Sequence, residues 1–207
     1  DDVLSVSAQF LTETQDQTME LLRSALTEPR FDAEAVERLR AQMLSGIASD
    51  AKDPQQIASD RFYALAFPDH PYGSPFEGTA ESVSALTRDD LVSAKDRVLA
   101  RDRVHVAAVG DIDAETLGAL LDRLLGGLPE TGAPLPAPAE WQLDGGVTVV
   151  DFDTPQSVIT FGQPGVARDD PDFFPAFVAT QILGGGGLTS RLMEEVRRER
   201  GLTYGIG

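Results

Sequence analysis

The stretch GGGGLTSRLMEEVRRERGLTYGIG, residues 184–207, decides the fold because it marks both ends of a helix and the start of the segment after it. Ser190 is of a residue type that caps helix N-termini, and apolar residues recur after it at helical spacing. Gly201 stands where a left-handed C-terminal cap would lie, and β-type residues follow it. We therefore expect Arg197 on the last helical turns and Tyr204 on a following strand, with both side chains able to face one ligand.

Helical patterns also cover much of the chain upstream of this stretch. Pro54 suits the first turn of a helix, Thr87 with Asp90 resembles a capping box, and Asp113 lies in a turn before an amphipathic run. Helices are predicted at residues 16–27, 32–49, 54–67, 91–99, 115–125 and 173–183.

Short runs of β-type sequence lie between these helices, at residues 3–11, 103–109, 146–152 and 157–161. Several of them alternate apolar and polar residues, as half-buried strands do. Helices and strands in this order predict an α+β fold, with mixed or antiparallel sheets and helices packed on one face.

Residues 129–138, within a segment rich in Pro, Gly and Ala, have no periodicity and are typical of a linker. We accordingly divide the chain into a first unit at residues 1–128, a linker at 129–145 and a second unit at 146–207. Neither unit is expected to be complete, because the chain begins and ends like an internal fragment of a longer protein.

The charge balance excludes several classes of partner. Seventeen basic and 34 acidic residues give a net charge of −17, which repels phosphate backbones and anionic membranes. No segment is apolar for the roughly 18 residues that a membrane-spanning helix needs. The absence of cysteine removes disulfides, thiolate catalysis and cysteine-based zinc sites. We expect neither nucleic-acid binding nor membrane insertion, and composition leaves the compartment open.

Several residues with chemical potential fit structural roles better. His70 lies in a turn, where a backbone hydrogen bond is favoured over metal ligation, and His105 lies in an apparent strand. Ser157 and Ser190 lack the surroundings of a hydrolase nucleophile. The four glycines lack the lysine and the spacing of a phosphate loop and favour a turn instead.

Arg197 has two interpretations at this point. On spacing alone it is a surface arginine in a charge-rich helix, where pairs such as Glu194 with Arg198 form across one turn. The other interpretation places it, with Tyr204, at a ligand.

A resemblance favours the second interpretation. The ending SRLMEEVRRERGLTYGIG resembles the second-half signature of the pitrilysin/insulinase family of zinc metallopeptidases, which includes mitochondrial processing peptidase. Further matches follow upstream in the family's order, so that the resemblance covers nearly the whole chain. They are FPDHPYGSPFEGTAESVSALTRDDL, AAVGDIDAETLGALLDRLLGGLP, TPQSVITFGQPG and DPDF.

The resemblance implies a duplicated α+β fold of the LuxS/processing-peptidase type, with a catalytic zinc site in the first half. Its His-x-x-Glu-His motif would lie upstream of Asp1, and a distal glutamate would fall inside this chain. Aligning residues 40–47 on the family pattern puts Gly46 at that ligand position and Leu39 at a supporting acidic position. Neither residue binds a metal through its side chain.

The family's second-half arginine and tyrosine, which hold the substrate backbone, match Arg197 and Tyr204. The resemblance therefore implies a non-zinc subunit that binds no cofactor itself. Its partners would be a paralogous subunit carrying zinc and an extended peptide. Two alternatives stay open: a full-length active zinc metallopeptidase, with Glu34 or Glu37 as ligand, and a purely structural relative of respiratory-complex core proteins. The resemblance slightly favours the bacterial periplasm over the cytoplasm.

Overall fold

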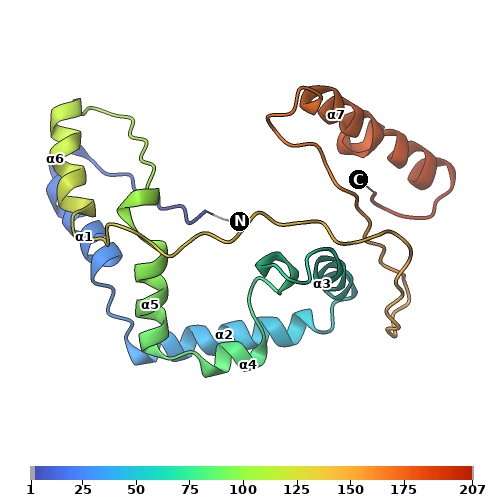
Figure 1. Cartoon of the computed structure of the whole chain (residues 1–207), viewed down its shortest axis with the longest axis horizontal. Coiled ribbons are helices and arrows are strands. Elements are labelled where there is room, and N and C mark those ends of the chain that lie inside the picture. Colours follow the sequence, from blue (N-terminus) through green and yellow to red (C-terminus); the bar gives the residue numbers. More distant parts are fainter. Residues whose placement is uncertain (1–2, 207) are drawn as a thin grey trace. The chain divides into compact units, whose positions relative to one another are not determined.

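The computed structural model describes residues 3–206 as helices joined by irregular segments (Figure 1). The chain divides into two compact units, the first ending at Thr160 and the second beginning at Phe161. This division reflects packing within the chain. The predicted linker boundary at 129–145 concerns two halves of a larger protein and stays a prediction.

Six α-helices and three short 3₁₀ turns make up the regular structure described in the first unit. They are η1 (Thr12–Thr14), α1 (Gln15–Thr27), α2 (Ala33–Asp50), α3 (Pro54–Ala66), η2 (Pro71–Gly73), α4 (Ala80–Ala85), α5 (Arg88–Val98), η3 (Arg101–Arg103) and α6 (Ala114–Leu125). The closest packing joins α1 to α6, α2 to α4 and α3 to η2. The five helices predicted in this region are confirmed to within about three residues at each end.

Most helix starts follow the capping chemistry expected from the sequence. The Asp90 amide donates to the Thr87 hydroxyl, and the Thr87 amide donates to the Asp90 carboxylate at 2.8 Å, which completes the predicted capping box. Asp113 accepts the Thr116 amide at 2.8 Å, as predicted. Asp32 precedes α2 without a side-chain capping bond and pairs with Arg30 instead. Asp32 therefore stands at the N-cap position of α2 without capping the helix through its side chain.

The predicted α+β fold is wrong: residues 3–206 contain helices and no strand, so neither the sheets nor the duplicated α+β arrangement is present. The β-type runs lie in irregular segments and expose their apolar side chains. Val109 is fully exposed, and Val147 is 91% exposed. Alternation selects residues that suit a pleated, half-buried surface, but a strand also needs a neighbouring segment to complete its hydrogen-bond ladder. Within residues 3–206, none of these runs has such a neighbour.

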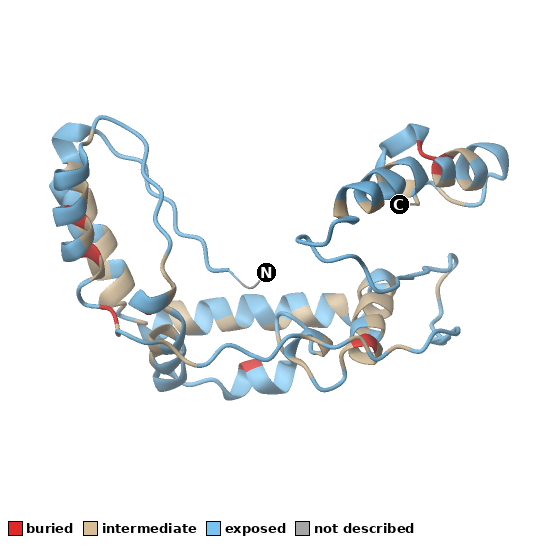
Figure 2. Cartoon of the chain, turned by 45° about the horizontal axis from the view of Figure 1, so that its top comes forward, coloured by how far each residue is buried: buried red, intermediate tan, exposed pale blue. Residues whose placement is uncertain are grey.

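Few side chains are fully buried, and they lie mainly where helices meet (Figure 2). Leu120 and Leu124 are buried on α6, the helix that packs on α1. Ala66, at the end of α3, and Ala100, just after α5, have no exposed surface. The core of the first unit is therefore a set of small contacts between neighbouring helices.

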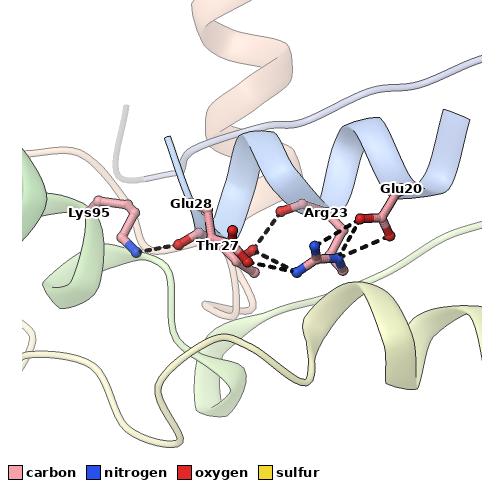
Figure 3. A network of polar contacts seen from close by, with 5 residues as sticks. All are labelled: Glu20, Arg23, Thr27, Glu28 and Lys95. Atoms are coloured by element: carbon pink, nitrogen blue, oxygen red, sulfur yellow. Dashed lines mark hydrogen bonds and ion pairs between the residues drawn. The ribbon is translucent and has the colours of Figure 1, made fainter. Parts of the chain in front are cut away.

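A polar network joins the end of α1 to α5 (Figure 3). Arg23 pairs with Glu20 at 2.8 Å and with Glu28 at 3.0 Å, and the Glu20 hydrogen bond lowers the pKa of that carboxyl. Lys95 donates to the Thr27 carbonyl oxygen at 3.1 Å. Carbonyl groups at a helix C-terminus lack intrahelical partners and carry partial negative charge, so a lysine there is stabilising.

The second unit is built around one apolar helix and a charged helix. It contains α7 (Phe173–Thr180), η4 (Gln181–Gly185), η5 (Gly187–Thr189) and η6 (Met193–Glu199). α7 runs directly into η4, which confirms the helix predicted at 173–183 and extends it with a π-helical turn. No helix in the described part of the chain is long and apolar enough to cross a bilayer.

Candidate functional site

The charged helix of the second unit begins where the sequence predicts. Ser190 is 2% exposed, and its hydroxyl accepts the Met193 amide at 3.4 Å. The Ser190 carbonyl accepts the Glu194 amide at 3.0 Å, which closes the first turn. Met193 is buried beside it and anchors this end of the helix. The Ser190 hydroxyl is therefore used as a cap, in agreement with its predicted structural role.

The other end of this helix closes around Gly201, which has a φ of 61°. The Gly201 amide donates to the Arg197 carbonyl at 3.0 Å, and the Leu202 amide donates to the Val196 carbonyl at 3.1 Å. A left-handed residue at this position is the predicted C-terminal cap, which is confirmed. The chain thus leaves the helix immediately after the turn that carries Arg197.

Arg197 and Tyr204 lie on either side of this cap, and both are exposed. Tyr204 is 87% exposed, and it lies in an irregular segment rather than on the predicted strand. Within residues 3–206, no ion pair or side-chain hydrogen bond engages either residue, and none joins them. Their joint action on one ligand stays a prediction.

The adjacent Arg198 differs from Arg197 in its ion pairing. Arg198 forms an ion pair with Glu194 one turn earlier, as predicted for this charge-rich helix. Arg197 lies in the same turn but is not held by that pair. Because a guanidinium offers five fixed donors, Arg197 keeps its full capacity to bind a peptide carbonyl or carboxylate.

The helix that carries Arg197 is π-helical from Met193 to Glu199. The Leu202-to-Val196 hydrogen bond, which reaches back six residues, extends this wide winding past the end of η6. π-helical turns are rare and are found frequently at functional sites, because they displace side chains from their ordinary α-helical directions. This geometry could not be read from the apolar spacing alone.

The two zinc-related positions lie on α2 in the first unit. Gly46 is exposed, and no atom lies within 4 Å of the place where a Cβ would stand. Leu39 is 53% exposed. Neither offers an oxygen, nitrogen or sulfur ligand, so the residues at these positions do not fit a zinc site.

The nearby carboxylate Glu37, considered as a replacement ligand, is already engaged. It pairs with Arg40 at 3.2 Å, and Arg40 in turn donates to the Leu86 carbonyl at 2.7 Å beyond the end of α4. This ion pair supports the packing of α2 on α4. Among the residues that the structure describes, no cluster of three His, Cys, Asp or Glu side chains is placed to hold a metal ion.

The histidines and the glycine run have structural roles or none. Both ring nitrogens of His70 meet the backbone, Nδ1 accepting the Tyr72 amide at 3.2 Å and Nε2 lying 3.0 Å from the Ala137 carbonyl oxygen. The predicted backbone role of His70 is thereby confirmed. His105 is exposed outside any helix. Gly187 has a φ of 68°, which agrees with the turn predicted for the glycine run.

Sequence reasoning missed an aromatic cluster at the end of α3. Trp141, from the supposed linker, lies edge-on to Phe62 and Phe67 with ring centroids 5.8 Å away in each case. The sequence does contain a sign of this cluster: its single tryptophan stands at the end of a Pro/Ala-rich segment, and tryptophan is a residue type that usually packs against other side chains.

Comparison with known proteins places these features in a family. The profile described as the peptidase M16 inactive domain matches residues 85–207. An uncharacterized zinc protease of Mycobacterium tuberculosis is 34% identical over 192 residues, covering 91% of this chain and 44% of its own length. The non-peptidase homolog YmxG of Helicobacter pylori is 28% identical, covering 98% of this chain and 47% of its own.

A solved structure agrees with these matches. The peptidase M16 inactive domain from Pseudomonas fluorescens superposes with a TM-score of 0.73 at 28% identity, over 94% of this chain and 47% of that one. The chain therefore spans about half the length of the relatives it matches.

Proposed function

The chain belongs to the peptidase M16 family, through its inactive-domain profile, and from this membership we propose that it acts in proteolysis as a subunit without zinc. It would supply Arg197 and Tyr204 to hold an extended peptide beside the zinc of a paralogous partner. The resemblance stated from sequence is confirmed at the level of the family. The subunit role, the partner and the substrate are the content of the proposal.

The observation that carries the proposal is Arg197, which lies at a capped helix end and has no ion pair within the described residues 3–206. Its neighbour Arg198 forms an ion pair with Glu194, whereas Arg197 and Tyr204 are exposed to solvent on either side of Gly201. A guanidinium and a phenol hydroxyl can donate hydrogen bonds to a peptide carbonyl and stabilise the charge that develops on attack. Gly201 holds the backbone between them in a fixed turn.

The α2 positions support the absence of a zinc site of this chain's own. A glycine stands where the family's pattern requires a carboxylate, and Leu39 stands at the supporting position. Glu37 would have to break its ion pair with Arg40 in order to serve as a zinc ligand. For these reasons the proposal places zinc on the partner subunit.

The proposal is tested on the full-length protein, purified alone and with its zinc-bearing paralogue. We expect no zinc bound by the isolated subunit and peptidase activity only when the two are combined. One equivalent of zinc together with peptidase activity in the isolated full-length protein would overturn the proposal.

A second candidate is an active zinc peptidase in the full-length chain. The name of the Mycobacterium tuberculosis relative, an uncharacterized zinc protease, favours it. The two candidates differ in the sequence upstream of Asp1. An intact His-x-x-Glu-His motif there would favour the active enzyme, and a degenerate one would favour the subunit.

A further inference from the structure

The Pro/Ala-rich segment after α6 is attached to the first unit at its beginning. The Arg101 amide donates to the Pro129 carbonyl at 2.9 Å, and the Ala133 amide donates to the Arg97 carbonyl at 3.0 Å. The Gly132 amide lies 3.2 Å from the Asp102 carboxylate. We call residues 129–133 and these partners the first clasp. It is made largely of main-chain bonds to the end of α5 and to η3.

The same segment is attached again near its end. The Gln142 amide donates to the Ala66 carbonyl at 2.9 Å, and the Trp141 ring lies against Phe62 and Phe67. His70 adds a bond to the Ala137 carbonyl at 3.0 Å. Residues 137–143 and these partners form the second clasp, on the last turns of α3 and the loop after it.

The stretch between the two clasps has the composition of a stiff spacer. Residues 134–138, which run from this stretch into the start of the second clasp, read PLPAP, and Leu135 is 77% exposed. Prolines favour the polyproline II conformation, which rises about 3.1 Å per residue, so residues 133–141 reach up to about 25 Å. Proline also lacks an N–H, so this exposed stretch leaves fewer backbone donors to satisfy. The segment behaves as a strap between two points rather than as a loose tether.

The two clasps differ in what holds them. Most bonds of the first clasp are between main-chain groups. In the second clasp, the bond of His70 to the Ala137 carbonyl and the contact of Gln142 with Asp69 are exposed to solvent, so water replaces them at low cost. Trp141 supplies the apolar contact, and its indole N–H is satisfied within the strap by the Leu143 carbonyl at 2.7 Å. The indole can therefore leave α3 without losing its hydrogen bond.

The chain directly after the second clasp is free to turn. Gly145 and Gly146 have φ values of 91° and 101°, and nothing lies within 4 Å of either Cβ position. Two adjacent glycines in this conformation place few limits on the backbone. When the second clasp opens, the chain that follows residue 143 is no longer held against α3. Gly145 and Gly146 can absorb the change in backbone direction without strain.

We propose that residues 129–143 form a strap whose first clasp stays closed while the second opens as one unit, when Trp141 leaves Phe62 and Phe67. Opening uncovers the aromatic face of α3 and frees the chain that follows from it. This opening of the strap, which we call the latch, does not depend on the proposed peptidase role. It concerns only contacts within the first unit.

Hydrogen exchange of the full-length protein, resolved at single amides, tests the latch. The reporter of the second clasp is the Gln142 amide, and the reporter of the first is the Ala133 amide. In the Trp141→Ala variant we expect exchange at Gln142 to rise roughly tenfold or more, because local opening sets the exchange rate. Exchange should stay unchanged at Ala133 and at the Phe67 amide, which follows α3 and donates to the Tyr63 carbonyl.

Three further variants keep the test decisive if Trp141→Ala folds poorly. Trp141→Phe retains an aromatic ring and should keep most of the protection at Gln142. His70→Ala removes a bond of the second clasp that water can replace, so it should raise exchange at Gln142 less than Trp141→Ala does, without affecting Ala133. Leu135→Ala, in the spacer, should change neither amide. Full exchange at Gln142 in the unmodified protein, or equal loss at Gln142, Ala133 and Phe67 in the variants, would overturn the proposal.

Discussion

Gly201 donates its amide to the carbonyl oxygen of Arg197 across 3.0 Å, and its φ of 61° lies in the left-handed region. This contact ends the helix at the turn that carries Arg197 and fixes the path toward Tyr204. A residue with a Cβ is strained in this conformation because the Cβ approaches its own backbone too closely. The cap therefore requires glycine because of its backbone angles, and not because neighbouring residues crowd the position.

The first prediction concerns this cap. Gly201→Ala should destabilise the end of η6 by about 1–2 kcal/mol, the usual cost of left-handed backbone in a residue with a side chain. Amide exchange at Leu202 should rise accordingly. Gly165→Ala is the matched control, since its Cβ position is open and its φ is not left-handed. Equal exchange at Leu202 in both variants would contradict the role of Gly201.

The second prediction concerns Gly46 within α2. Its surroundings are open and its position is interior to the helix, so Gly46→Ala should raise the free energy of unfolding by roughly 0.5–1 kcal/mol. Gly118→Ala on α6, which is equally open, should act in the same direction. The measurement is the denaturant midpoint of the full-length protein. A loss of stability at Gly46 alone would mean that this glycine is needed for a contact.

The third prediction is an acid dependence of the helix caps. The Thr116 amide lowers the pKa of Asp113 below its ordinary 3.8, and the Thr87 hydroxyl lowers that of Asp90 in the same way. A carboxylate with a lowered folded-state pKa contributes stability above its unfolded pKa and loses it as the pH falls through the folded value. The caps should therefore contribute fully at neutral pH and weaken progressively as the pH falls below the ordinary aspartate pKa of 3.8 toward the lowered folded-state values.

Denaturant unfolding at about pH 7 and about pH 3 measures this dependence. Asp113→Asn keeps an acceptor oxygen but cannot titrate, so its stability should change less between the two conditions. Asp144→Asn serves as control, because the Asp144 side chain forms no hydrogen bond or ion pair within the described residues 3–206. An unchanged acid dependence in Asp113→Asn would reject the assignment.

The helices and their caps could be predicted because their determinants are local. Thr87 and Asp90 are three residues apart, and Gly201 follows its helix directly, so the sequence window contains the whole interaction. That the β-type runs form no strands within residues 3–206 could not be predicted in this way. Val147 and Val149 alternate as a strand would, yet pairing depends on a distant segment that no local pattern specifies.

The strap and the site show the same limit. Trp141 contacts Phe62 and Phe67 across more than seventy residues, and the composition that predicts a linker gives no sign of this contact. The role of Gly46 came only from resemblance, because an exposed glycine in a helix has no chemistry of its own. Arg197 was recognisable as a candidate, but its freedom from ion pairing became visible only beside the Arg198 pair.

The central claim is tested most directly by comparing two adjacent arginines in the assembled complex of the full-length protein with its zinc-bearing partner. Arg197→Ala should lower kcat/KM for an extended peptide by roughly 100-fold, the size of effect seen when one donor to a developing oxyanion is removed. Arg198→Ala should leave kcat/KM within about twofold, because it removes only a surface ion pair. Equal activity of the two variants would contradict the account.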